Sequence, residues 1–169
     1  MNPHLGDTPS DWLAVAELPP LRGADAFEDA RLADGVLDTS VLVYLFDADE
    51  PEKQARARGL LREDAEIRLS TQVLQEFYVA TTRKLAKPLA TEQARRVVDD
   101  LGVFPIARIS HHLLLSAIDR SVASQVSFWD GLIIETALAE GARRLVSEDL
   151  QDGWEIERMR VWNPFASVA

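Results

Sequence analysis

Four acidic residues stand where the surrounding sequence predicts the end of a strand or the start of a helix: Asp38, Glu76, Asp130 and Asp149. Two of them follow short apolar segments that have the pattern of buried strands, and the other two lie in the first turns of expected helices. Carboxylate oxygens are the ligands that hard divalent cations prefer. If the fold brings these acids together, they predict a site for Mg²⁺ or Mn²⁺.

Asp130 gives the strongest argument that a cation is needed. Ile133, Ile134 and Ala137 follow it at helical spacing, so the acid is expected on the apolar, core-facing side of its helix. A buried carboxylate without a partner costs several kcal/mol, on the order of a lost core side chain. No Lys or Arg stands at helical spacing on that side, and Glu76 has similarly apolar neighbours. A divalent cation would neutralise both acids.

Each acid also has a purely structural explanation. Asp38 would cap the helix that follows it, and Ser127 with Asp130 fits a capping box. Asp149 would stabilise a surface turn, and Glu76 would be a solvated helix acid. These explanations account for each residue singly, but not for four acids from four separate elements at one edge of a sheet.

The elements that would position these acids alternate along the chain. Strands are expected over 35–38, 67–69, 103–109, 144–147 and 159–162, and helices over 40–46, 51–61, 73–86, 91–101, 110–121 and 128–139. Short apolar strands separated by helices predict an α/β fold with a parallel sheet covered on both faces. The functional crevice of such folds lies at the carboxyl ends of the strands, where the four acids are expected.

Residues 1–33 differ in composition from the rest of the chain. They contain four prolines and six acids, with scattered apolar residues and a possible short helix over residues 11–18 that Pro19 and Pro20 would end. We therefore predict an N-terminal extension over 1–33, partly ordered at best, and a folded domain over 34–169.

Composition narrows the chemistry. The chain has no cysteine, which excludes disulfides and thiolate metal sites and is compatible with the cytoplasm, where we expect the protein. Three histidines are a poor supply for zinc, and His111 and His112 are given no role. No apolar stretch approaches the roughly 20 residues needed to span a bilayer, so no membrane association is expected. The first residues lack the pattern of a secretory signal.

The net charge of −10 counts against a nucleic-acid partner, because proteins that bind nucleic acid usually present a positive surface. Local basic clusters could still follow a phosphate backbone: Arg83, Lys84 and Lys87; Arg95 and Arg96; and Arg143 and Arg144. The alternative is that these residues are solvated helix ends favoured by the helix dipole.

Four segments together resemble the motifs of PIN domains. They are Val36–Leu42 (VLDTSVL), Leu74–Phe77 (LQEF), Ser127–Ile133 (SFWDGLI) and Leu145–Gly153 (LVSEDLQDG). Their order and spacing are similar to the family pattern from about residue 34 to 165. The combination resembles the ribonuclease toxins of bacterial VapBC-type toxin–antitoxin pairs, although these typically begin only a few residues before the first aspartate.

The resemblance implies a three-layer fold, with a central parallel sheet of four to five strands flanked by helices, and often a homodimer. It implies an Mg²⁺- or Mn²⁺-dependent endoribonuclease whose partner is a small antitoxin protein. Matched residue by residue, it gives metal-site roles to Asp38, Glu76, Asp130 and Asp149. It also gives hydrogen-bonding support to Ser40 and Ser147, and an assisting role to Asp152.

The predicted reaction is hydrolysis of RNA that leaves a 5′ phosphate, with Asp38 and Asp130 contacting the main cation, while Asp149 and Glu76 position waters or hold a second ion. One alternative is a catalytically silent PIN-like binding module. Another is an aspartyl phosphotransfer domain, because an aspartate after a strand suits a nucleophile. That last alternative ranks lower because no lysine follows Lys87 to hold a phosphoryl group near the crevice.

Overall fold

The computed structural model describes residues 35–63 and 66–167 of the 169-residue chain. The predicted extension over residues 1–33, including its possible helix over 11–18, lies outside the described residues. The folded domain predicted from residue 34 onwards therefore begins, as far as the structure describes it, with a strand at Gly35.

A six-stranded sheet forms the centre of the fold, in the order β3-β2-β1-β4-β6-β5. Its parallel strands are β1 (Gly35–Leu37), β2 (Ile67–Ser70), β3 (Ile106–Ala107), β4 (Arg144–Val146) and β6 (Met159–Trp162). The sixth strand, β5 (Glu155–Ile156), pairs antiparallel with β6.

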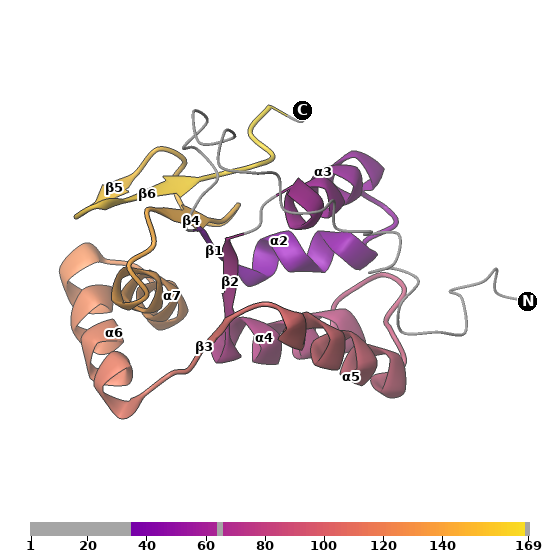
Figure 1. Cartoon of the computed structure of the whole chain (residues 1–169), viewed down its shortest axis with the longest axis horizontal. Coiled ribbons are helices and arrows are strands. Elements are labelled where there is room, and N and C mark those ends of the chain that lie inside the picture. Colours follow the sequence, from indigo (N-terminus) through magenta and orange to yellow (C-terminus); the bar gives the residue numbers. More distant parts are fainter. Residues whose placement is uncertain (1–34, 64–65, 168–169) are drawn as a thin grey trace, which may run out of the picture.

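Helices cover both faces of this sheet (Figure 1). On one side lie α2 (Thr39–Val43) with the short 3₁₀ helix η2 (Tyr44–Phe46), α3 (Pro51–Glu63), α4 (Thr71–Arg83), and α5 (Thr91–Asp100) with η3 (Leu101–Val103). On the other side lie α6 (His111–Ser124) and α7 (Phe128–Ala139). The predicted α/β fold with helices on both faces is confirmed.

The strands differ from the sequence prediction at both edges of the sheet, where β5 and β3 lie. The prediction of four to five strands missed β5, which has only two residues and too little sequence for an alternating pattern. The strand expected over 103–109 shrinks to β3, because Pro105 before it has no N–H to donate. The Pro105 carbonyl nevertheless accepts a hydrogen bond from the Leu69 amide, at 3.0 Å.

Helix boundaries shift where a cap decides them. Helix α4 starts at Thr71, two residues before the expected position, because the Ser70 side chain accepts a hydrogen bond from the Val73 amide at 3.2 Å. Helix α7 spans the predicted residues 128–139. Both helices therefore begin directly at the rim where the acids were expected.

The core lies between the sheet and both helix layers. All three residues of β1 are buried, and so are Phe77 on α4 and Ile133 on α7. Helices α6 and α7 approach closely at Gly131, because a Cβ there would lie only 2.7 Å from the Ala117 carbonyl oxygen. This close packing fixes the first turn of α7 against the rest of the domain.

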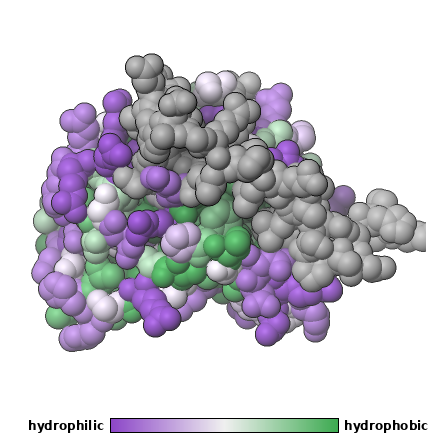
Figure 2. All heavy atoms as spheres, in the orientation of Figure 1, coloured by the Kyte–Doolittle hydropathy of each residue, from purple (hydrophilic) through white to green (hydrophobic). Residues whose placement is uncertain are grey.

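On the face drawn in Figure 2, hydrophobic residues lie among hydrophilic ones. Four exposed large apolar side chains lie on α6: Leu114, Leu115, Ile118 and Val122. No helix in the described part of the chain is both long and apolar enough to cross a membrane.

Candidate functional site

The candidate site lies where the order of strands reverses. The chain proceeds outward from β1 to β2 and β3, and then returns through α6 and α7 to β4, which pairs with the other side of β1. A crevice opens at the carboxyl ends of strands at such a point. Asp38 follows β1 directly, and Asp149 follows β4 after two residues, so both stand at this edge.

All four predicted acids line one cavity of about 690 Å³ at this edge. They come from separate elements: the end of β1, helix α4, the first turn of α7, and the loop after β4. The same cavity is lined by six further side chains that the following paragraphs use: Thr39, Tyr44, Gln72, Val79, Lys84 and Trp129. The fold therefore brings the four acids into one depression.

Asp38 is the most buried of the four, at 7% exposure. Its carboxylate accepts hydrogen bonds from the Thr39 amide and from Ser147 Oγ, both at 2.6 Å, so it also caps α2. Burial raises its pKa from 3.8 to about 6, against the lowering effect of the Ser147 hydrogen bond, and the charges of Asp149 and Glu76 add to the rise. No ion pair joins Asp38 to a basic group in the described part of the chain.

Glu76 is oriented by two neutral donors. Its Oε2 accepts a hydrogen bond from Thr39 Oγ1 at 2.8 Å, and its Oε1 accepts one from Gln72 Nε2 at 3.0 Å. Gln72 also donates to the Trp129 carbonyl at 3.1 Å, which links α4 to α7 across the cavity. Sequence reasoning missed Thr39 and Gln72, although Gln72 stands four residues before Glu76, at helical contact spacing.

Asp130 departs from the sequence prediction in its environment. It was expected to be buried, yet it is only half-buried, because the first turn of α7 ends at the rim rather than under the core. Its amide donates to Ser127 Oγ at 3.1 Å, so the predicted cap is present as well. The burial argument made for Asp130 applies instead to Asp38.

Asp149 lies at the exposed rim of the cavity. Its pKa is raised first by partial burial and then by the charges of Glu148, Asp130 and Glu76. Within the described residues, the carboxylates of Asp149 and Asp130 have neither a hydrogen-bond donor nor a basic partner. These two acids are therefore available to a ligand.

The predicted supporting residues divide into two groups. Ser147 Oγ donates to Asp38 and accepts from the Asp149 amide at 3.2 Å, and Ser40 Oγ accepts from the Glu148 amide at 3.2 Å. Both serines thus connect the end of β1 to the loop after β4. Asp152 does not line the cavity, and its carboxylate accepts from the Asn163 amide at 2.8 Å instead.

Comparison with known proteins identifies the family of the chain. The sequence profile of the PIN domain matches residues 35–151. The chain belongs to the PIN domain family. None of the curated protein sequences matches this PIN domain significantly.

Solved structures share the fold at low sequence identity. The Mycobacterium tuberculosis toxin VapC20, described as cleaving the sarcin–ricin loop, is 17% identical, with a TM-score of 0.55 over 66% of this chain and 86% of that one. A toxin–antitoxin complex from Klebsiella pneumoniae is 20% identical, with a TM-score of 0.59 over 77% and 97%. VapBC2 from Rickettsia felis, bound to a promoter DNA fragment, is 19% identical, with a TM-score of 0.54 over 76% and 98%. At these identities the likeness concerns the fold.

The donor chemistry of this PIN domain suits a hard cation, since the site offers carboxylate oxygens, one of them on a buried acid whose burial raises its pKa. The side chains are nevertheless spread around the cavity. Among residues 35–63 and 66–167, no three Asp, Glu or His side chains lie close enough together to hold an ion. A Mg²⁺ ion commonly keeps several waters and binds one or two carboxylates, so the arrangement fits a hydrated ion.

A second polar cluster, missed by sequence reasoning, adjoins the PIN-domain cavity. Tyr44 Oη donates to Glu148 Oε2 at 2.5 Å, and Lys53 Nζ donates to Glu148 Oε1 at 2.5 Å and to Tyr44 Oη at 2.9 Å. The hydrogen bond to Glu148 raises the pKa of Lys53. The cluster joins η2 and α3 to the loop that carries Asp149, and it neutralises the acid next to Asp149.

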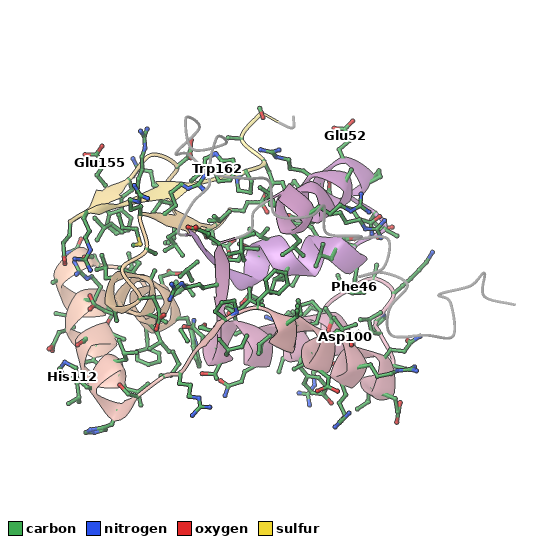
Figure 3. The ribbon with its side chains drawn as sticks, in the orientation of Figure 1. Phe46, Glu52, Asp100, His112, Glu155 and Trp162 are labelled. Atoms are coloured by element: carbon green, nitrogen blue, oxygen red, sulfur yellow. The ribbon has the colours of Figure 1, made fainter. Side chains whose placement is uncertain are left out.

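Two further sequence inferences concern Lys84 and the histidines. The argument against a phosphotransfer domain assumed that no lysine lies near the crevice, but Lys84, at the end of α4, lines the cavity. The position of Lys84 in the sequence did not show that it lies near the crevice. It does so because α4 extends along the cavity wall and ends beside it. His112 lies at the outer edge of the molecule, on α6 (Figure 3), and neither His111 nor His112 lines the cavity.

Proposed function

We propose that this PIN domain is a divalent-metal-dependent endoribonuclease, the toxin of a type II toxin–antitoxin pair. The observation that carries the proposal is the cavity itself: four carboxylates from four elements face it, and no ion pair within the described residues neutralises any of them. Such a site would repel a phosphodiester unless cations reversed its sign.

Asp38 and Asp130 would contact the main cation, which is Mg²⁺ or Mn²⁺. Asp149 and Glu76 would position waters or hold a second ion. A cation at this place supplies activation of water and neutralisation of charge on the phosphate. Thr39 and Gln72 keep Glu76 turned toward the site, and Ser147 keeps Asp38 fixed beside the Asp149 loop. The product would carry a 5′ phosphate.

The full chain incubated with total RNA tests this proposal. We expect cleavage with Mg²⁺ or Mn²⁺ and none with EDTA, and mapping the ends should reveal 5′ phosphates. Asp38→Asn and Asp130→Asn should abolish cleavage, whereas Asp99→Asn on the exposed surface of α5 should leave it unchanged. Circular dichroism would verify folding of each variant. Normal cleavage by either site variant would refute the assignment.

The proposed partners are a small antitoxin protein and a second copy of the chain, acting in the cytoplasm on RNA. The solved structures with this fold include toxin–antitoxin complexes, which supports an antitoxin partner. Co-expression with small proteins encoded beside this one, followed by affinity purification and light scattering, would identify the partner and the stoichiometry. An antitoxin should restore growth of cells in which the chain alone is toxic.

One observation favours the alternative of a catalytically silent PIN-like module: as placed, no three acids in the described residues converge closely enough to hold an ion. Calorimetric titration with Mn²⁺ separates the two functions. A nuclease should bind Mn²⁺, and Asp38→Asn should lose that binding. A silent module would bind no cation and cleave no RNA in any metal.

A further inference from the structure

One large aromatic side chain is exposed at the rim of the acidic cavity. Trp129, in the first turn of α7, is 56% exposed and lines the cavity beside Asp130. Every other aromatic side chain in residues 35–63 and 66–167 is buried or half-buried. The core therefore does not account for Trp129.

The position of Trp129 is nevertheless defined. Its carbonyl accepts the hydrogen bond from Gln72 Nε2, the same group that orients Glu76, and its ring makes an edge-to-face contact with Phe128 at 5.3 Å between centroids. The Gln72 hydrogen bond thus fixes the backbone at Trp129 and the Phe128 contact orients the ring, while more than half of the residue's surface stays open.

Trp162 differs from Trp129 in its ring contacts and its exposure. The Trp162 ring is half-buried on β6, with the guanidinium groups of Arg56 and Arg144 at 5.5 and 5.1 Å from its centre. The Trp162 ring is therefore contacted by side chains of the same chain. Trp129 has only the contact with Phe128 among the ring contacts of the described residues.

The other wall of the cavity supplies complementary chemistry. The exposed Val79 on α4 and Lys84, which directly follows α4, line the same cavity as Trp129 and the acids. These groups match the parts of an RNA strand. The aromatic ring suits a base, the Lys84 ammonium group suits a phosphate, and the carboxylates suit a cation that binds a phosphodiester.

Because Trp129 lines the cavity beside Asp130 with its ring exposed, we propose that this ring stacks on an unpaired nucleobase adjacent to the phosphate that is cut. The inference rests on the proposed nuclease function and deepens it. Bases in a duplex are stacked on one another and present no free face, whereas unpaired bases stack on aromatic side chains.

Stacking of one base on an aromatic side chain corresponds to roughly 5- to 150-fold in affinity. Trp129→Ala should weaken binding of single-stranded RNA within this range and raise KM more than it lowers kcat. Trp129→Phe, which keeps an aromatic face, should retain most of the affinity. Val122→Ala is the matched control, because it shortens an exposed apolar side chain on a different helix, α6. It should leave the RNA affinity unchanged.

Binding is measured with the full chain and decauridylate in Ca²⁺, by quenching of tryptophan fluorescence and by anisotropy of a labelled oligonucleotide. We expect quenching in the unaltered chain, loss of most quenching in Trp129→Phe, and at least fivefold weaker binding of a matched RNA duplex. An oligonucleotide with one abasic nucleotide beside the cleaved bond should bind the unaltered chain and Trp129→Ala equally.

Equal affinity of Trp129→Ala and the unaltered chain for decauridylate would overturn the inference. So would unchanged RNA affinity together with loss of self-association or of antitoxin binding, which would assign Trp129 to a protein interface. Binding that depends on Trp129 in a chain that cleaves no RNA would refute the nuclease proposal and the position of the base beside a cleaved phosphate, but would support stacking of a base on Trp129.

Discussion

Asp38→Asn should stabilise the metal-free protein at neutral pH. The substitution keeps an oxygen for the Thr39 amide and removes the charge that burial disfavours. The rise in the pKa of Asp38 from 3.8 to about 6 corresponds to about 3 kcal/mol of destabilisation when the carboxylate is ionised. The Asn amide group accommodates Ser147 less well than the second carboxylate oxygen does, so we expect a net gain of about 1–2 kcal/mol.

The effect of Asp38 on the free energy of unfolding depends on pH. Below pH 3.8 Asp38 is protonated in both the folded and the unfolded chain, and its burial carries no charge penalty. Between pH 3.8 and about 6 only the unfolded chain ionises this group, so the free energy of unfolding falls as the pH rises. Above about pH 6 the penalty is complete. The advantage of Asp38→Asn should therefore be largest above pH 6 and vanish near pH 4.

Urea denaturation in EDTA, followed by circular dichroism at several pH values between 4 and 8, measures this difference. Asp99→Asn is the control, because it removes an exposed acid from α5. Added Mn²⁺ should stabilise the unaltered chain more than Asp38→Asn, since a ligand of the folded state shifts unfolding by mass action. If Asp38→Asn is less stable than the unaltered chain at pH 7.5 in EDTA, the electrostatic reasoning is wrong.

Two more substitutions test how the site is positioned. Gly131→Ala should destabilise the fold by about 1–3 kcal/mol and lower activity, because its Cβ would lie 2.7 Å from the Ala117 carbonyl oxygen. Gly102→Ala is the control: its Cβ meets nothing within 4 Å, so thermal denaturation should show a stability close to that of the unaltered chain. Lys53→Met should lower kcat with little change in KM, because Glu148 then lacks its cation and the loop beside the site is less well fixed; unchanged kcat would remove Lys53 from the site's support.

Local sequence signals were sufficient to predict the bounds of α7 and the meeting of two of the acids. Helix α7 begins and ends as predicted, because Ser127 caps its start and Gly141, with a φ of +73°, follows its end. The meeting of Asp38 and Asp149 was predictable as well, since parallel strands place their carboxyl ends at one edge. Neither inference needed knowledge of distant contacts.

Burial and hydrogen-bond partners depended on contacts that sequence spacing does not encode. Glu148 pairs with Tyr44 across 104 positions of the chain, and Glu76 with Thr39 across 37. The helical pattern around Asp130 gave the direction of its side chain but not the point where the core ends. For that reason the sequence assigned to Asp130 the burial that belongs to Asp38.

The four acids divide into two pairs with different constraints. Asp38 and Glu76 are fixed by donors within the domain, whereas Asp130 and Asp149 have no such partner in the described residues. Like charges repel, so an ion between them would be needed to draw the two unfixed carboxylates together. Cation binding should therefore reorient Asp130 and Asp149 far more than the fixed pair. This division reconciles a cavity lined by four acids with the lack of a three-acid cluster in the described residues, because Asp130 would join Asp38 only once a cation is bound.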